Sequence, residues 1–85
     1  MNCLIVEDEK VAQKLVGLIK KYNSSIDIVE IIQSVKNAVK WLNNNKAPDL
    51  IFMDIQLADG LSFEIFEQTI VKTPVIFTTA YDEYA

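Results

Sequence analysis

The sequence contains no histidine, no arginine and only one cysteine among its 85 residues. Without histidine, His-based catalytic triads and His-ligated metal sites are excluded, so phosphoryl or acyl chemistry must use carboxylates and hydroxyls. The single cysteine, Cys3, can form neither an internal disulfide nor a cysteine metal site. Its place in an apolar run predicts a buried, reduced thiol in a cytoplasmic protein.

Glycine and proline are also scarce, with two of each, while 51% of the residues are hydrophobic and 24% are charged. This composition is typical of a folded globular domain, and the length predicts one domain. The net charge is −4 and the lysines are scattered, so we expect no direct nucleic-acid binding by this segment. No apolar run approaches the ~18 residues of a membrane span, and we expect no membrane partner.

Apolar and amphipathic segments alternate along the chain. A first helix should begin at Asp8 or Glu9, a second at Ser34, and a third should run from Ser62 to Val71. Short β-branched or apolar runs between them predict four strands, the second near a sheet edge: 3–6, 26–32, 49–54 and 75–79. The expected inward-facing helix residues include Val11, Leu15, Leu18, Ile19 and Tyr22 in the first helix and Phe63, Phe66 and Ile70 in the third.

This alternation predicts a parallel α/β sheet with right-handed crossovers and helices on both faces. Ligands bind such sheets outside the carboxyl ends of the strands. Glu7 and Asp8 follow the first strand and Asp54 closes the third, so we expect three carboxylates at one edge. Thr78 and Thr79 should reach the same edge, although Thr78 is expected to face the packing side.

Crowded carboxylates need a cation, and Mg²⁺ suits a site made of oxygen ligands alone. Asp8 and Asp54 are the best candidates for direct ligands, and Glu7 could hold a metal-bound water. The backbone carbonyl of Gln56 could complete the set. The simpler alternative is a solvated turn in which the acidic residues only cap the first helix.

Three stretches resemble the receiver domains of two-component response regulators, namely IVEDE, DLIFMDIQL and PVIFTTAYDEYA; the last is similar to receivers of the LytTR transcription-regulator class. The resemblance implies a flavodoxin-like, doubly wound parallel sheet with strand order 2-1-3-4. It implies that Asp54 is the phosphoacceptor, that Glu7 and Asp8 serve Mg²⁺, and that Thr79 is the switch hydroxyl. It also implies a sensor histidine kinase as partner, a DNA-binding output domain that this segment lacks, and a signalling role rather than an enzymatic one.

The chain departs from the family pattern in two places. Ala58 and Ser62 stand where receivers usually carry proline and glycine, with Gly60 between them. The resemblance also implies a fifth strand with a lysine and a last helix, so we expect residues 1–85 to be a receiver domain incomplete at its C-terminal side. The open edge of the fourth strand could then pair with a second copy.

Two other functions are compatible with parts of the pattern. A phosphatase of the haloacid dehalogenase type also uses a strand-end aspartate, but it wants a second aspartate where Gln56 stands. A receiver-like module that only mediates dimerisation would need no phosphorylation. Tyr81 and Tyr84 fit either an output surface or plain packing.

Overall fold

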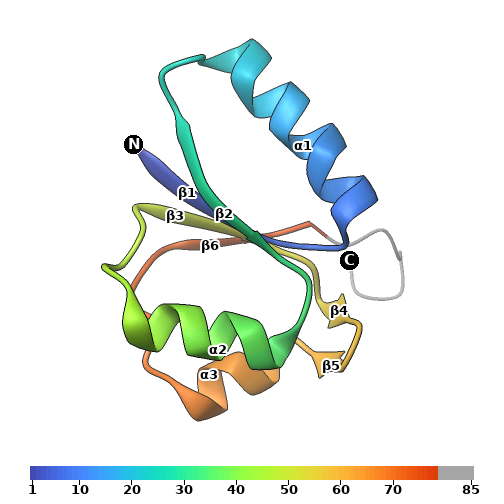
Figure 1. The fold of residues 1–85 in the computed structure, drawn as a ribbon, viewed down its shortest axis with the longest axis vertical. Helices are drawn as coiled ribbons and strands as arrows, with labels where there is room; N and C mark the ends of the chain where they lie inside the picture. Colours follow the sequence, from blue (N-terminus) through green and yellow to red (C-terminus); the bar gives the residue numbers. More distant parts are fainter. Residues whose placement is uncertain (79–85) are drawn as a thin grey trace.

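The computed structural model describes residues 1–78 as a parallel sheet with helices on both faces (Figure 1). The strand order is β2-β1-β3-β6, and all three strand pairs are parallel. Since β6 is the fourth predicted strand, the predicted order 2-1-3-4 is confirmed, as is the edge position of β2. The bounds of the four strands are β1 Asn2–Val6, β2 Asp27–Ile32, β3 Leu50–Met53 and β6 Val75–Phe77.

Helices cover the two faces of the sheet unequally. In Figure 1, α1 lies on one side of the sheet while α2 and α3 lie together on the other. Their bounds are α1 Glu9–Tyr22, α2 Val35–Asn44 and α3 Phe63–Gln68. None of the helices in residues 1–78 combines the length and the apolar character that crossing a membrane requires.

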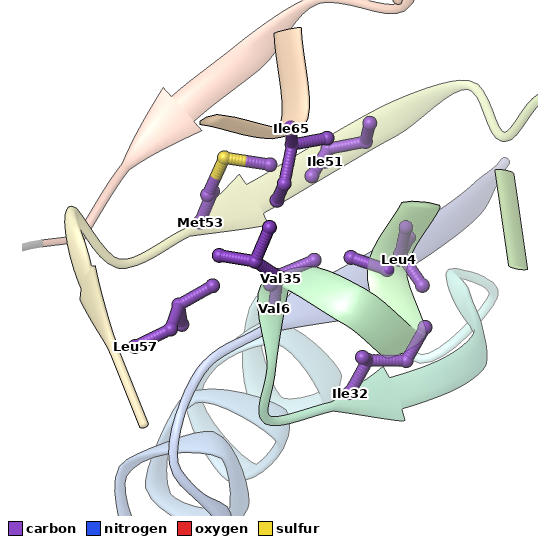
Figure 2. Close-up of a cluster of buried hydrophobic side chains, with 9 residues drawn as sticks. Leu4, Val6, Ile32, Val35, Ile51, Met53, Leu57 and Ile65 are labelled. Atoms are coloured by element: carbon purple, nitrogen blue, oxygen red, sulfur yellow. The ribbon is translucent and has the colours of Figure 1, made fainter. Parts of the chain in front are cut away.

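The inner strand β1 is the centre of the core, with residues 3 to 6 all 0% exposed. Leu4 and Val6 belong to the cluster under α2 and α3, which also contains Ile51, Met53 and Ile65 (Figure 2). Ile5 points to the opposite face and packs with the residues of α1. A strand covered on both faces must be apolar throughout, which is why residues 3–6 carry no alternation of polar and apolar side chains.

The predicted inward stripe of α1 is partly wrong. Ala12, Leu15 and Ile19 pack against the sheet, but Leu18 and Tyr22 are 66% and 87% exposed. The five predicted residues span a stripe of about 100° on the helix, but the stripe that contacts the sheet is turned toward Ala12 and Val16, which the prediction did not include. Apolar spacing alone therefore predicted only part of the side of this helix that faces the sheet.

The third helix is shorter than predicted and faces the sheet differently. It ends at Gln68 because Thr69 is extended, and Ser62 makes no side-chain capping bond. Ile65 is fully buried, whereas the expected inward residues Phe63 and Phe66 are 44% and 39% exposed. Both phenylalanines instead contact the ring of Phe77 edge-on, with centroids 5.8 and 6.4 Å apart. Ile70, the third expected inward residue, lies beyond the helix and is exposed.

The segment after β3, which the sequence presents only as a loop, forms a small antiparallel hairpin. Its strands are β4 (Gln56–Leu57) and β5 (Gly60–Leu61). Gly60 has φ +147°, and a Cβ there would lie 2.3 Å from a carboxylate oxygen of Glu64. The positive φ favours glycine at this turn, whereas the contact involves only the flexible end of the Glu64 side chain, which can shift.

Asp59, at the tip of this hairpin, holds the start of α2. Its two carboxylate oxygens accept hydrogen bonds from Val35 N (2.7 Å) and Lys36 N (3.1 Å). Ser34 Oγ accepts from Asn37 N (3.1 Å), and the Ser34 carbonyl accepts from the next amide. All four N-terminal amides of α2 are thus satisfied, although only the Ser34 cap was predicted.

We predict that Asp59→Ala lowers the thermal midpoint by several degrees at pH 7, because two helix amides lose their acceptor. These hydrogen bonds hold the pKa of Asp59 below its usual value of 3.8. The contribution of Asp59 to stability is therefore present above that value and disappears as the pH falls through the lower pKa of the folded state. Thermal unfolding followed by circular dichroism between pH 2 and pH 7 measures this.

Asp27→Ala, at an exposed aspartate that begins β2, is the matched control and should shift the midpoint much less. Equal shifts for the two variants would show that Asp59 contributes nothing beyond its surface charge.

Candidate functional site

The acidic residues Glu7 and Asp54 lie side by side at the carboxyl edge of the sheet. Each directly follows a strand, and their strands are neighbours with Val6 paired to Met53. Asp54 N donates to the carbonyl of Val6 at 2.8 Å, which fixes the end of β3 against the end of β1. Parallel pairing thus brings together two carboxylates that are 47 positions apart in the sequence.

Glu7 is almost fully buried, with 1% of its surface exposed, and donors hold both of its carboxylate oxygens. Oε1 accepts from Asp8 N at 3.0 Å, and Oε2 accepts from Thr78 Oγ1 at 2.9 Å. Burial raises the pKa of Glu7 to about 7; the hydrogen bonds from Thr78 and Asp8 oppose this rise, and the nearby Asp54 carboxyl adds to it. Glu7 therefore sits at the boundary between its neutral and charged forms near neutral pH.

Asp54 is half-buried, and its Oδ1 atom is enclosed with no hydrogen-bond partner among residues 1–78. A buried carboxylate oxygen without a donor is costly, and here a second carboxyl group lies beside it. A divalent cation would satisfy this oxygen and offset the repulsion between the two acids. The oxygen-only character of the pair fits Mg²⁺.

Asp8 and Gln56, the other two predicted Mg²⁺ ligands, are exposed. Asp8 is the N-cap of α1, and its Oδ1 accepts from Val11 N at 3.1 Å, as the cap prediction required. No group of three or more acidic, histidine or cysteine side chains within residues 1–78 is close enough to hold a metal. The full ligand set of Glu7, Asp8, Asp54 and the Gln56 carbonyl therefore stays a prediction.

Thr78 is the site residue that the sequence reasoning placed wrongly. It was expected to face the packing side, yet its hydroxyl donates to Glu7. The signal was present in the strand register, since Ile5, Phe52 and Ile76 are aligned across the three strands. Side chains alternate along strands, so the residues two positions later, Glu7, Asp54 and Thr78, also share one face.

Thr79, predicted as the switch hydroxyl, lies outside the described residues, as do Tyr81 and Tyr84. Glu7 and Asp54 do not line the cavity that lies beside β2 and α2 in the described part of the chain. This cavity has a volume of about 460 Å³, and its lining includes Gln33, Asn37 and Trp41. The acidic pair therefore lies at the carboxyl ends of the strands, apart from this cavity.

We predict that the stability of the metal-free protein falls as the pH rises from about 4.5 to about 7. The folded state holds the Glu7 proton more tightly than the unfolded chain, because the pKa is raised from 4.5 to about 7 on folding. This stabilisation is complete below the unfolded-state pKa of 4.5 and is lost as the pH rises through the folded-state pKa of about 7. Urea unfolding in the presence of a chelator, at pH 4.5, 6, 7 and 8, measures this trend.

Glu7→Gln should flatten this dependence and raise the midpoint at pH 8, because it removes the buried charge. Glu9→Gln, at an exposed residue of the first turn of α1, should keep the wild-type trend. If the stability of Glu7→Gln fell with pH as steeply as that of the wild type, Glu7 would not be the group that causes the pH dependence.

Comparisons with known proteins agree with this geometry. A model of the response regulator receiver domain matches residues 3–85. The sensory transduction protein LytT of Bacillus anthracis is 35% identical over 88 residues, which cover 100% of this chain and 35% of LytT. The chain thus spans about a third of the length of the curated relatives that it matches.

Two solved structures are similar over almost the whole chain. One is the N-terminal domain of a response regulator/sensory box/GGDEF 3-domain protein from Carboxydothermus hydrogenoformans, with a TM-score of 0.77 and 33% identity, covering 96% of this chain and 66% of that one. The other is the MaeR response regulator bound to beryllium trifluoride, with a TM-score of 0.73 and 27% identity, covering 99% and 70%. With the family model spanning nearly every residue and the predicted sheet order confirmed, the chain belongs to the response regulator receiver domains of two-component systems.

Proposed function

We propose that Asp54 is the phosphoacceptor of this receiver domain and that its phosphorylation switches an output. The observation that carries the proposal is the Asp54 Oδ1 atom, which is buried beside a second carboxyl group and has no hydrogen-bond partner in the described part of the chain. A carboxylate kept without donors is a stronger nucleophile than one whose lone pairs are occupied. The printed description of MaeR adds support, because beryllium trifluoride, a phosphoryl mimic, is bound to a protein of similar fold.

The phosphoryl transfer itself is a single displacement. A carboxylate oxygen of Asp54 attacks phosphorus in line, an O–P bond forms, and the P–N bond of a phosphohistidine breaks. The imidazole nitrogen keeps the electron pair of the broken bond and takes up a proton. Since the chain has no histidine of its own, we infer that the donor is a sensor histidine kinase.

Glu7, Asp8, Asp54 and the Gln56 backbone carbonyl are the residues that we assign to Mg²⁺. When bound, the ion supplies positive charge that offsets the repulsion between the nucleophile and the incoming phosphoryl group. Glu7 reaches its charged form more readily next to a cation, because the cation opposes the effect of burial on its pKa. Asp8 can take part only by rotating away from its capping bond or by using its second oxygen.

Downstream of the transfer, we assign the switch to the Thr79 hydroxyl. A phosphoryl group carries up to two negative charges and would draw a hydroxyl donor toward it. The similarity to LytT, a sensory transduction protein, supports a LytTR-class regulator of transcription whose DNA-binding output domain is not part of residues 1–85. We place this function in the cytoplasm, where the single thiol of Cys3 stays reduced.

The site supports signalling better than catalytic turnover. A phosphatase of the haloacid dehalogenase type needs an acid two residues after the nucleophile, and Gln56 cannot serve as one. We therefore propose that the chain is a phosphorylated switch rather than an enzyme.

We predict that acetyl phosphate with Mg²⁺ phosphorylates the protein and that Asp54→Asn abolishes the modification. The phosphorylated form should be lost on treatment with hydroxylamine, because an acyl phosphate reacts with this nucleophile. Intact-protein mass spectrometry measures the reaction, with the 85-residue chain and with the same chain inside its parent protein.

Asp49→Asn is the matched control, since Asp49 precedes β3 at the opposite edge of the sheet. It should be phosphorylated like the wild type. Modification that persists in Asp54→Asn, or that is absent from the wild type in the parent protein, would overturn the phosphoacceptor assignment and favour a module that acts only by association.

A further inference from the structure

Thr78 connects two strands that are not neighbours. It directly follows β6, and its hydroxyl reaches Glu7 at the end of β1 at a distance of 2.9 Å. In the sheet order β2-β1-β3-β6, the strand β3 lies between them. Adjacent strands are about 4.8 Å apart, so these two side chains bridge about twice that spacing above the end of β3.

The residue that lies beneath this bridge is Asp54, which directly follows β3. Thr78 N donates to the carbonyl of Met53 at 2.8 Å, so the backbone of Thr78 is itself fixed to the strand that carries Asp54. Glu7 is fixed in the same way, because its amide donates to the carbonyl of Ile32 at 2.9 Å. The hydroxyl–carboxylate bond therefore joins two anchored residues on either side of the phosphoacceptor.

Thr78 also binds the oxygen of Glu7 that the amide of Asp8 does not bind. Oε1 accepts from Asp8 N, whereas Oε2 accepts from the Thr78 hydroxyl, its one hydrogen-bond donor within residues 1–78. Without that hydroxyl, the Glu7 side chain could rotate about its terminal bond while its backbone stayed in place. The orientation of the carboxylate toward Asp54 thus depends on Thr78.

We propose that Thr78 is a positioning residue that orients Glu7 toward Asp54 and thereby sets the affinity of the acidic pair for a divalent cation. This inference rests on the proposed function of the pair as a magnesium site, and it assigns to Thr78 a role separate from that of Thr79. Residues that orient metal ligands typically contribute 10- to 100-fold to metal affinity. Thr78 acts through Glu7 and needs no contact with the metal or the phosphoryl group.

The test is Mg²⁺ binding measured by isothermal titration calorimetry on the wild type and three variants. Thr78→Val keeps the shape of the side chain but removes the donor, and it should weaken Mg²⁺ binding about tenfold. Thr78→Ser keeps the donor and should restore affinity to within about threefold of the wild type. Rescue by serine separates positioning from packing, because serine lacks the methyl group that valine retains.

Thr73→Val is the matched control. Thr73 lies before β6 at the opposite edge of the sheet, and its hydroxyl donates to the carbonyl of Pro48 at 2.9 Å. This variant should lose thermal stability without a change in Mg²⁺ affinity. The thermal midpoint of each variant in chelator shows that it is folded before the titration.

The outcomes separate this inference from the proposed function. If the wild type binds Mg²⁺ and Thr78→Val binds equally well, or if Thr78→Ser fails to restore the affinity, the positioning role is wrong while the magnesium site stands. If the wild type binds no Mg²⁺ at all, the site assignment fails and the role of Thr78 falls with it. A loss of affinity in Thr73→Val as large as that in Thr78→Val would also overturn the proposal.

Discussion

Two carboxyl groups, those of Glu7 and Asp54, repel each other at the ends of adjacent strands, and this repulsion determines the electrostatics of the site. Glu7 is nearly inaccessible to water, and the Oδ1 atom of Asp54 is enclosed with no donor among residues 1–78, so solvent disperses little of the charge between the two groups. In the metal-free protein the proton on Glu7 relieves this repulsion near neutral pH. The proton on Glu7 and the proposed cation and phosphoryl group would therefore act at the same place, and each would change the electrostatic balance of the other two.

The core of the sheet is what makes such a costly arrangement stable. Four consecutive residues of β1 are fully buried, and the strand packs against clusters on both faces. A one-residue slip in register would move every side chain of the strand to the opposite face. The same apolar contacts that fix Ile5 opposite Phe52 therefore also fix Glu7 beside Asp54.

Much of this architecture follows from the sequence because apolar runs and helix caps are local signals. The caps at Asp8 and Ser34 and the alternation of strands and helices were predicted from such signals. The strand order, and with it the meeting of Glu7 and Asp54, was predicted from the resemblance to receiver domains. The inward face of α3 was not, since Phe63 and Phe66 carry the helical spacing of core residues but contact Phe77 at the surface.

Two polar contacts were out of reach of sequence reasoning for a different reason. Asp59 holds helix amides that lie more than twenty positions away, and Thr78 holds a carboxylate 71 positions away. Nothing local marks either residue, because an aspartate in a turn and a threonine after a strand are ordinary choices there. The register of the three strands would have revealed Thr78, but that register is known only once the sheet is assembled.

The two hydrogen bonds between Asp59 and α2 limit how the length of the segment before Asp59 can vary. Four residues, Ile55 to Ala58, separate Asp54 from Asp59, and both ends of this short span are held. Surface loops usually accept insertions and deletions at little cost. Here one added or deleted residue would pull the hairpin off the helix or displace the Asp54 carboxylate, so natural variants should differ in the identity of these residues while their number stays constant.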